Sequence, residues 1–220
     1  DRRGTQVPDG LPASLTDAVR RRLTSLVSAS GDAPTVTTHA PFSGAPIVEL
    51  PQSSPDDVVA AAARARVAQR AWAARTIDDR AQVMLRLHDL VLDARDDLMD
   101  LIQAENGKSR RDAYLEVADI AITCRYYART AASVLAPSGR TGLIPGLTSV
   151  QELRHPKGVV TVISPWNYPL SLAAGDSIPA LLAGNAVLQK ADNQTALTAL
   201  HALDLARRAG VPEDLWQIVL

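Results

Sequence analysis

The last third of the chain alternates apolar segments of strand length with apolar segments of helix length, and no other feature constrains the fold as strongly. From residue 158 onward the segments are GVVTVIS, PLSLAAGDSIPALLAG, NAVLQK, QTALTALHALDLARRAG and LWQIVL. Each helical segment ends at a glycine, Gly184 or Gly210, the residue favoured just past a helix C-terminus. Apolar strands separated by helices predict a parallel sheet with helices on both faces, so the predicted fold class is α/β.

The middle of the chain is predicted to be mainly helical. In SSPDDVVAAAARARVAQRAWAA, Ser54 can cap a helix whose first turn contains Pro55. A second helix is expected to start at Thr76, and a third is expected over residues 109–135, before Pro137. Ahead of these helices, PTVTTHAPFSGAPIVEL predicts two short strands joined by a turn.

One further helix is expected near the N-terminus, in SLTDAVRRRLTSLV. Ser14 is its predicted cap, and its apolar face would consist of Leu15, Val19, Leu23, Leu26 and Val27. Residues 1–12 are polar and are predicted to be loose. The arginines at 20–22 are interpreted as a solvated helix face.

Charge and composition favour a small-molecule role. The 220 residues carry a formal net charge of -1, so neither nucleic acid nor an anionic membrane surface is an expected partner. No apolar run approaches the roughly 20 residues that cross a bilayer. The single cysteine, Cys124, cannot form an intrachain disulfide and is compatible with a cytoplasmic location. The four histidines lack metal-ligand spacing, so no metal site is expected.

Two polar segments are expected at one edge of the sheet, because ligands of open parallel sheets bind beyond the carboxyl ends of the strands. Ser164 to Asn167 follow the first strand, and Gln189 to Asn193 end the second. Pro165 and Pro169 restrict the backbone around Asn167, whose side-chain N–H groups could stabilise a developing oxyanion. The alternative is that Asn167 caps the next helix and Trp166 fills a gap in the core.

The segments GVVTVISPWNYP and PALLAGNAVLQKADNQTALTAL resemble the N-terminal half of the aldehyde dehydrogenase superfamily. The likeness is sharpest over residues 156–212 and continues, more weakly, from about residue 34 to 135. Within the superfamily, PWNYPLSLAAGDSIPALLAGNAVL is most similar to the bacterial NADP-linked succinate-semialdehyde dehydrogenases. The resemblance implies an aldehyde dehydrogenase-like fold, in which a helical N-terminal segment leads into the first half of a parallel, Rossmann-like cofactor-binding sheet.

The resemblance also implies a division of the chain. Residues 1–33 would form a loose N-terminal segment with one helix, and residues 34–140 the leading strands and helices of the cofactor domain. Residues 141–157 would be a linker with an oligomerisation strand. Residues 158–220 would be the first βαβαβ part of the dinucleotide-binding domain, cut at its C-terminus. In such a fragment we expect the edge of the last strand to be exposed.

Site roles follow from the resemblance at matching positions. Asn167 would form part of the oxyanion hole that receives the aldehyde oxygen. The nicotinamide end of the cofactor would lie along Ile163, Ser164, Pro165 and Trp166. Lys190 would reach the adenosine ribose, from a loop that continues with Ala191, Asp192 and Asn193.

The cofactor is predicted to be NADP, with NAD as the alternative. Many NAD-using relatives have a glutamate three residues after the lysine, whereas this chain has Asn193. A neutral amide does not repel a 2′-phosphate, and Lys190 can pair with that phosphate. Asp192 would oppose this preference if its carboxylate pointed toward the cofactor.

The family's cysteine nucleophile and glutamate base are expected downstream of this chain, which would therefore be inactive alone. The full-length parent would oxidise an aldehyde to a carboxylic acid through a cysteine thioester, as a homodimer or homotetramer. Cys124 is interpreted as a packing residue, and Glu116 and Asp119 are assigned no catalytic role. Tyr168, Ser171 and Leu172 would face the substrate tunnel. No arginine lies among them, so a broad-specificity aldehyde dehydrogenase is the alternative, as is a non-catalytic binding or assembly module.

Overall fold

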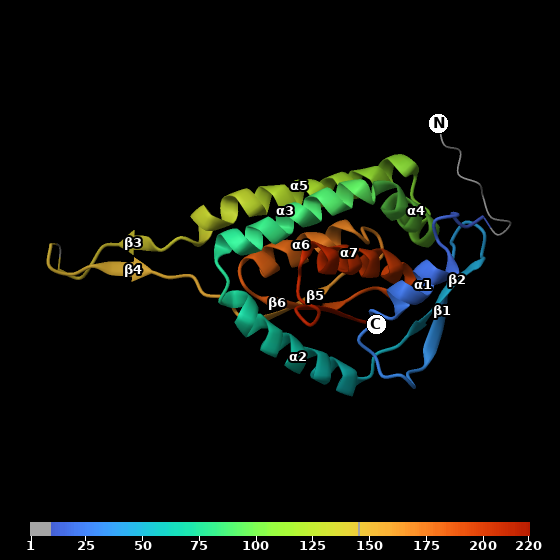
Figure 1. Ribbon diagram of the computed structural model, residues 1–220, viewed down its shortest axis with the longest axis horizontal. Helices are drawn as coiled ribbons and strands as arrows, with labels where there is room; N and C mark the ends of the chain where they lie inside the picture. Colours follow the sequence, from blue (N-terminus) through green and yellow to red (C-terminus); the bar gives the residue numbers. More distant parts are fainter. Residues whose placement is uncertain (1–9, 145) are drawn as a thin grey trace.

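The computed structural model describes residues 10–144 and 146–220. The chain forms stacked layers around the parallel sheet that the sequence predicts (Figure 1). Helices α3 and α5 lie over α6 and α7, which cover one face of the sheet, while α2 covers the other face. The helices are α1 (Asp17–Thr24), α2 (Pro55–Ala73), α3 (Ile77–Asp93), α4 (Arg95–Asn106), α5 (Arg110–Leu135), α6 (Ser171–Leu182) and α7 (Ala196–Ala209), with a short 3₁₀ helix η1 (Asn193–Thr195).

The central sheet has the order β5 (Val159–Ile163), β6 (Ala186–Lys190), β7 (Trp216–Val219), with both pairs parallel. The predicted strand–helix alternation is therefore confirmed. Gly184 and Gly210 have φ angles of 89° and 109°, the left-handed conformation that ends a helix without a Cβ clash. The sheet is the platform from which the polar rim segments project.

The helical layer begins at the caps that the sequence predicts. The Ser54 hydroxyl accepts a hydrogen bond from the amide of Asp57 (3.1 Å), and the Asp57 carboxylate accepts one from the amide of Ser54 (2.9 Å). Thr76 caps α3 through the amide of Asp79 (3.0 Å). Each cap gives an otherwise unpaired N–H group a partner, so the helix starts are determined locally.

The prediction for the N-terminal helix is wrong in its boundaries. Thr16, not Ser14, caps α1, accepting a hydrogen bond from the amide of Val19 (3.3 Å). The Ser14 hydroxyl instead donates to the Asp100 carboxylate on α4 (2.7 Å), a tertiary contact between residues 86 positions apart. The helix ends at Thr24, so Leu26 and Val27 lie beyond it. Residues 1–9, included in the predicted loose segment, lie outside the described residues.

The expected exposed edge of the last strand is also wrong. All four residues of β7 are buried. The amide of Ser28 donates to the carbonyl of Ile218 (2.8 Å), and the amide of Ser53 donates to the carbonyl of Leu220 (3.0 Å). Segments from the front of the chain thus pair with strand carbonyls that would otherwise lack partners.

A hairpin of β3 (Ser138–Arg140) and β4 (Val150–Glu152) extends away from the layered body (Figure 1). The predicted division at residues 140 and 141 falls between its two strands. In the segment that connects the two strands, Leu143 is 92% exposed and Leu147 is 78% exposed. A second hairpin, of β1 (Thr35–His39) and β2 (Pro46–Pro51), confirms the two early strands. Across the described residues, no helix combines the length and the apolar character needed to cross a membrane.

Candidate active site at the carboxyl rim of the sheet

The two predicted polar segments leave neighbouring strands at the same rim. Ile163, the last residue of β5, is the register partner of Lys190, the last residue of β6. Just past the pair, the amide of Ser164 donates to the carbonyl of Lys190 (3.0 Å). The loop containing Asn167 and the loop containing Asn193 therefore begin at adjacent points.

A row of buried hydrogen bonds crosses the three strands beneath this rim. The indole N–H of Trp216 donates to Gln189 Oε1 (3.0 Å), and Gln189 Nε2 donates to Ser164 Oγ (2.8 Å). Ser164 and Gln189 are buried. Because a buried polar side chain needs a hydrogen-bond partner, this bond holds Ser164, and with it the start of the loop, against β6.

Of the four residues predicted to lie along the nicotinamide end of the cofactor, Ser164 is buried and the other three are exposed. Ile163 is 78% exposed and Trp166 56% exposed, and Pro165 and Asn167 are exposed as well. Asn167 is exposed, and in the described part of the chain its side-chain amide makes no hydrogen bond.

The alternative reading of this motif is wrong. The residue at the N-cap position of α6 is Leu170, and α6 has no hydrogen bond to a capping side chain of its own loop. Asn167 therefore does not cap the helix, and the half-exposed Trp166 does not fill a core gap. Pro169 precedes the helix, which begins at Ser171.

The N-terminus of α6 is capped instead by Glu116, from the middle of α5. Glu116 Oε2 accepts hydrogen bonds from the amides of Leu170 (2.9 Å) and Ser171 (3.1 Å). Lys108 Nζ pairs with Glu116 Oε1 at 2.5 Å. Glu116 is 2% exposed, and a charge so deeply buried needs these partners. Glu116 is predicted above to need no catalytic role, and its capping role was missed. A glutamate on the apolar face formed by Ala113, Val117 and Ile120 is a signal for such a role.

The side chains of the predicted cofactor loop, residues 190–193, bind mainly to groups near them. Lys190 Nζ donates to the carbonyl of Ala191 (2.7 Å). The Asp192 carboxylate accepts a hydrogen bond from the amide of Gln194 (2.9 Å) and so caps η1. Asn193 Nδ2 donates to Gln52 Oε1 (2.8 Å), and its Oδ1 is buried with no partner among the described residues.

A second buried glutamate holds the helix after this loop. Glu105 of α4 accepts hydrogen bonds from the amides of Leu197 and Thr198 (both 2.8 Å) and from the Thr198 hydroxyl (2.7 Å). Burial raises the pKa of Glu105 from 4.5 to about 7, although the hydrogen bonds from Thr198 and Leu197 act in the opposite direction. The helical layer therefore supplies one carboxylate to each helix that follows a rim loop.

A cavity of about 390 Å³ lies between α5 and the start of α6. It is lined by Leu115, Glu116, Asp119, Tyr168, Ser171 and Leu172. The three residues predicted to face a common channel, Tyr168, Ser171 and Leu172, are thus brought together with α5. Within the described residues, no arginine or lysine lines this cavity.

Cys124 is a packing residue, as predicted. It is fully buried on α5, and burial raises the pKa of its thiol to about 12. A thiol with such a pKa is not a nucleophile near neutral pH. Across residues 10–144 and 146–220, no group of three His, Cys, Asp or Glu side chains could hold a metal ion.

Comparisons with known proteins agree with this architecture. A family model described as "Aldehyde dehydrogenase family" matches residues 27–220. A protein of Mycolicibacterium smegmatis named "Putative succinate-semialdehyde dehydrogenase (NADP+)" is 50% identical over 178 residues, which cover 81% of this chain and 34% of that protein. The chain thus spans about a third of the length of this curated relative.

Solved structures show the same fold. Succinate-semialdehyde dehydrogenase from Burkholderia pseudomallei matches with a TM-score of 0.83 at 28% identity, over 87% of this chain and 39% of that one. NADP-dependent glyceraldehyde-3-phosphate dehydrogenase from Bacillus halodurans, solved with NADP, matches with a TM-score of 0.81 at 32% identity, over 87% and 41%.

Proposed function

The chain belongs to the aldehyde dehydrogenase family, and on this basis we propose that it forms the cofactor-facing and oxyanion-binding half of a site that oxidises an aldehyde to a carboxylic acid with NADP. The observation that carries the proposal is the shared rim, where Ile163 and Lys190 are register partners and Asn167 is exposed beside them. The nucleophilic cysteine and the glutamate base of such an enzyme are expected outside these 220 residues. Below, "full-length enzyme" means a chain of the relatives' length that contains this segment.

The residues at the rim fit NADP. The exposed side chains of Ile163, Pro165 and Trp166 offer an apolar surface for the nicotinamide end. The ammonium of Lys190 offers a charge for the ribose phosphate, and the Asp192 carboxylate is occupied by its own turn. The Asn193 side chain is neutral and does not repel a phosphate. When bound, NADP supplies the acceptor for hydride.

The proposed role of Asn167 is to bind the aldehyde oxygen as it becomes an oxyanion. A donor of this kind accelerates a reaction when its N–H is already directed at the position where the charge develops. The Asn167 amide is exposed and has no hydrogen-bond partner among the described residues, so an incoming oxygen could accept from its N–H groups without breaking an existing bond. Replacing Asn167 by alanine in the full-length enzyme tests the proposal.

The proposed substrate is succinate semialdehyde, which the relatives' names support. A specific observation favours a second candidate, a broad-specificity enzyme for uncharged aldehydes. The cavity beside the rim is lined by Leu115, Tyr168 and Leu172 and by the Asp119 carboxylate, with no cation among its described residues to bind a substrate carboxylate. Kinetics of the full-length enzyme with succinate semialdehyde and with butanal separate the two, since a specific enzyme must prefer the acid-bearing aldehyde.

We also propose that the β3–β4 hairpin takes part in assembly of a homodimer or homotetramer in the cytoplasm. Its exposed apolar residues, led by Leu143 and Leu147, support this proposal. Apolar side chains on a projecting hairpin are typical of a subunit contact.

A further inference from the structure

The loop that carries Asn167 is held from outside by one segment of the helical layer, residues 106–116. Asn106 Nδ2 donates to the carbonyl of Trp166 (2.7 Å), the residue before Asn167. The Lys108 ammonium lies 3.8 Å from the ring centroid of Tyr168, the residue after it. Both neighbours of Asn167 in the chain are therefore bound to the same short turn.

Glu116 binds the same loop three and four residues after Asn167. Its carboxylate accepts hydrogen bonds from the amides of Leu170 and Ser171 and pairs with Lys108. The position of the Glu116 carboxylate at the N-terminus of α6 is also favourable because a negative charge there interacts with the helix dipole. The lysine thus joins the carboxylate that caps α6 to the aromatic ring beside Asn167.

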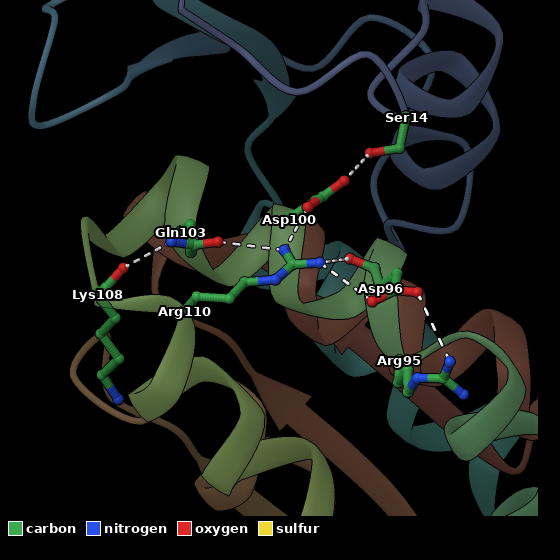
Figure 2. A network of polar contacts seen from close by, with 7 residues as sticks. All are labelled: Ser14, Arg95, Asp96, Asp100, Gln103, Lys108 and Arg110. Carbon is green, nitrogen blue, oxygen red and sulfur yellow. Dashed lines mark hydrogen bonds and ion pairs between the residues drawn. The ribbon is translucent and has the colours of Figure 1, made fainter. Parts of the chain in front are cut away.

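The turn itself is braced by a polar network on α4 (Figure 2). Gln103 Nε2 donates to the carbonyl of Lys108 (3.2 Å), and Gln103 Oε1 accepts from Arg110 (3.2 Å). Arg110 also pairs with Asp96 and Asp100. Figure 2 shows the Lys108 side chain pointing away from this network, which leaves its ammonium free to reach Glu116.

Resting on the proposed function, we infer that Lys108 and Glu116 are positioning residues for Asn167. Because no side-chain hydrogen bond holds the Asn167 amide in the described chain, the backbone of residues 166–171 determines where that amide lies. An oxyanion donor must lie about 2.7–3.1 Å from the oxygen it binds. A displacement of about 1 Å can lower the rate roughly a hundredfold.

The test replaces each partner in the full-length enzyme. Glu116→Gln and Lys108→Met should each lower kcat roughly tenfold to a hundredfold, the range of rate loss that follows small misplacements. The dissociation constant for NADP, measured by fluorescence titration, should stay at the wild-type value. Lys108→Arg keeps a cation for both Glu116 and the Tyr168 ring, and it should restore most of the lost kcat. If Glu116→Gln does not fold, the comparison of kcat between Lys108→Met and Lys108→Arg tests the positioning role.

Trp72→Phe is the matched control for stability. The Trp72 indole N–H donates to the carbonyl of Leu181 (2.7 Å), so this variant weakens the opposite end of the same helix, α6. It should lower the melting temperature without the loss of kcat. An equal loss of kcat in Trp72→Phe would overturn the inference, because the effect would then follow helix stability alone.

A double-mutant cycle provides the decisive measurement. If Glu116 acts through Asn167, adding Glu116→Gln to Asn167→Ala should lower kcat no further. Additive losses, or wild-type kcat in Glu116→Gln, would overturn the positioning role. A wild-type kcat in Asn167→Ala alone is a different result, because it would refute the proposed oxyanion function.

Discussion

Ile163 and Lys190 end adjacent parallel strands as register partners, so the loops that follow them start one strand spacing apart, about 4.8 Å. This relationship places the Asn167 amide and the Lys190 ammonium on one rim. Residues 23 positions apart in the sequence therefore leave the sheet at the same edge.

Asn167→Ala should lower turnover of the full-length enzyme by about two to three orders of magnitude. The loss of one oxyanion donor costs roughly 2.7–4 kcal/mol of transition-state stabilisation. Turnover should be measured with a deuterated aldehyde, so that hydride transfer is shown to limit the rate. NADP binding serves as the folding control. Wild-type turnover under these conditions would remove Asn167 from the mechanism.

Lys190→Gln should weaken NADP binding roughly tenfold to a hundredfold, because a hydrogen bond to a charged group contributes about 1.5–3 kcal/mol. Binding of NAD should change less, since it has no 2′-phosphate. Titration of both cofactors gives the ratio of dissociation constants. The companion variant Asn193→Glu should shift the preference toward NAD, and an unchanged ratio in both variants would contradict the cofactor assignment.

Glu105→Gln should remove a pH dependence of stability. The folded-state pKa of Glu105 is about 7, raised from 4.5 by burial, so between these values the folded state binds more protons than the unfolded state. The contribution of this group is therefore fully present below pH 4.5 and is lost as the pH rises through about 7. The loss in wild type should be of the order of 3 kcal/mol.

Urea denaturation at pH 5 and pH 7.5 measures this effect as a difference in the free energy of unfolding. Glu49→Gln, at an exposed position on β2, is the control and should retain the wild-type pH dependence. If Glu105→Gln also retains it, the raised pKa of Glu105 is wrong.

Cys124→Ala should leave aldehyde oxidation intact, because the thiol is fully buried and burial raises its pKa to about 12. We expect a loss of stability of about 1 kcal/mol from the smaller side chain. Steady-state kinetics and thermal unfolding report the two effects separately. Loss of turnover in a folded variant would mean that Cys124 is more than a packing residue.

Replacing both Leu143 and Leu147 with aspartate should reduce the size of the assembly formed by the full-length enzyme. Charged residues within an apolar subunit contact lose solvation without gaining a partner. Sedimentation velocity measures the change. Val59→Asp, at a 68% exposed apolar position on α2, is the control for a new surface charge and should leave assembly unaffected. Unchanged assembly in the hairpin variant would place the contact elsewhere.

Most helix and strand positions, and the shared rim, follow from local sequence patterns. Local signals delimit the helices through contacts within a few residues: the capping box at Ser54 starts α2, and the glycines at 184 and 210 end α6 and α7. The strand–helix alternation then places Asn167 and Lys190 at the same edge, because consecutive parallel strands point their carboxyl ends the same way.

The groups that support the rim come from distant parts of the chain and are known only from the folded structure. Glu116 caps a helix 54 positions away, and Glu105 caps one 92 positions away. Ser14 binds Asp100 instead of capping its own helix, and Ser28 covers the edge of β7. The physical reason is that a polar group removed from water, fully for the two glutamates and partly for the two serines, needs a partner, and any donor or acceptor that the fold brings within reach can provide it. Local sequence patterns do not specify such long-range partners.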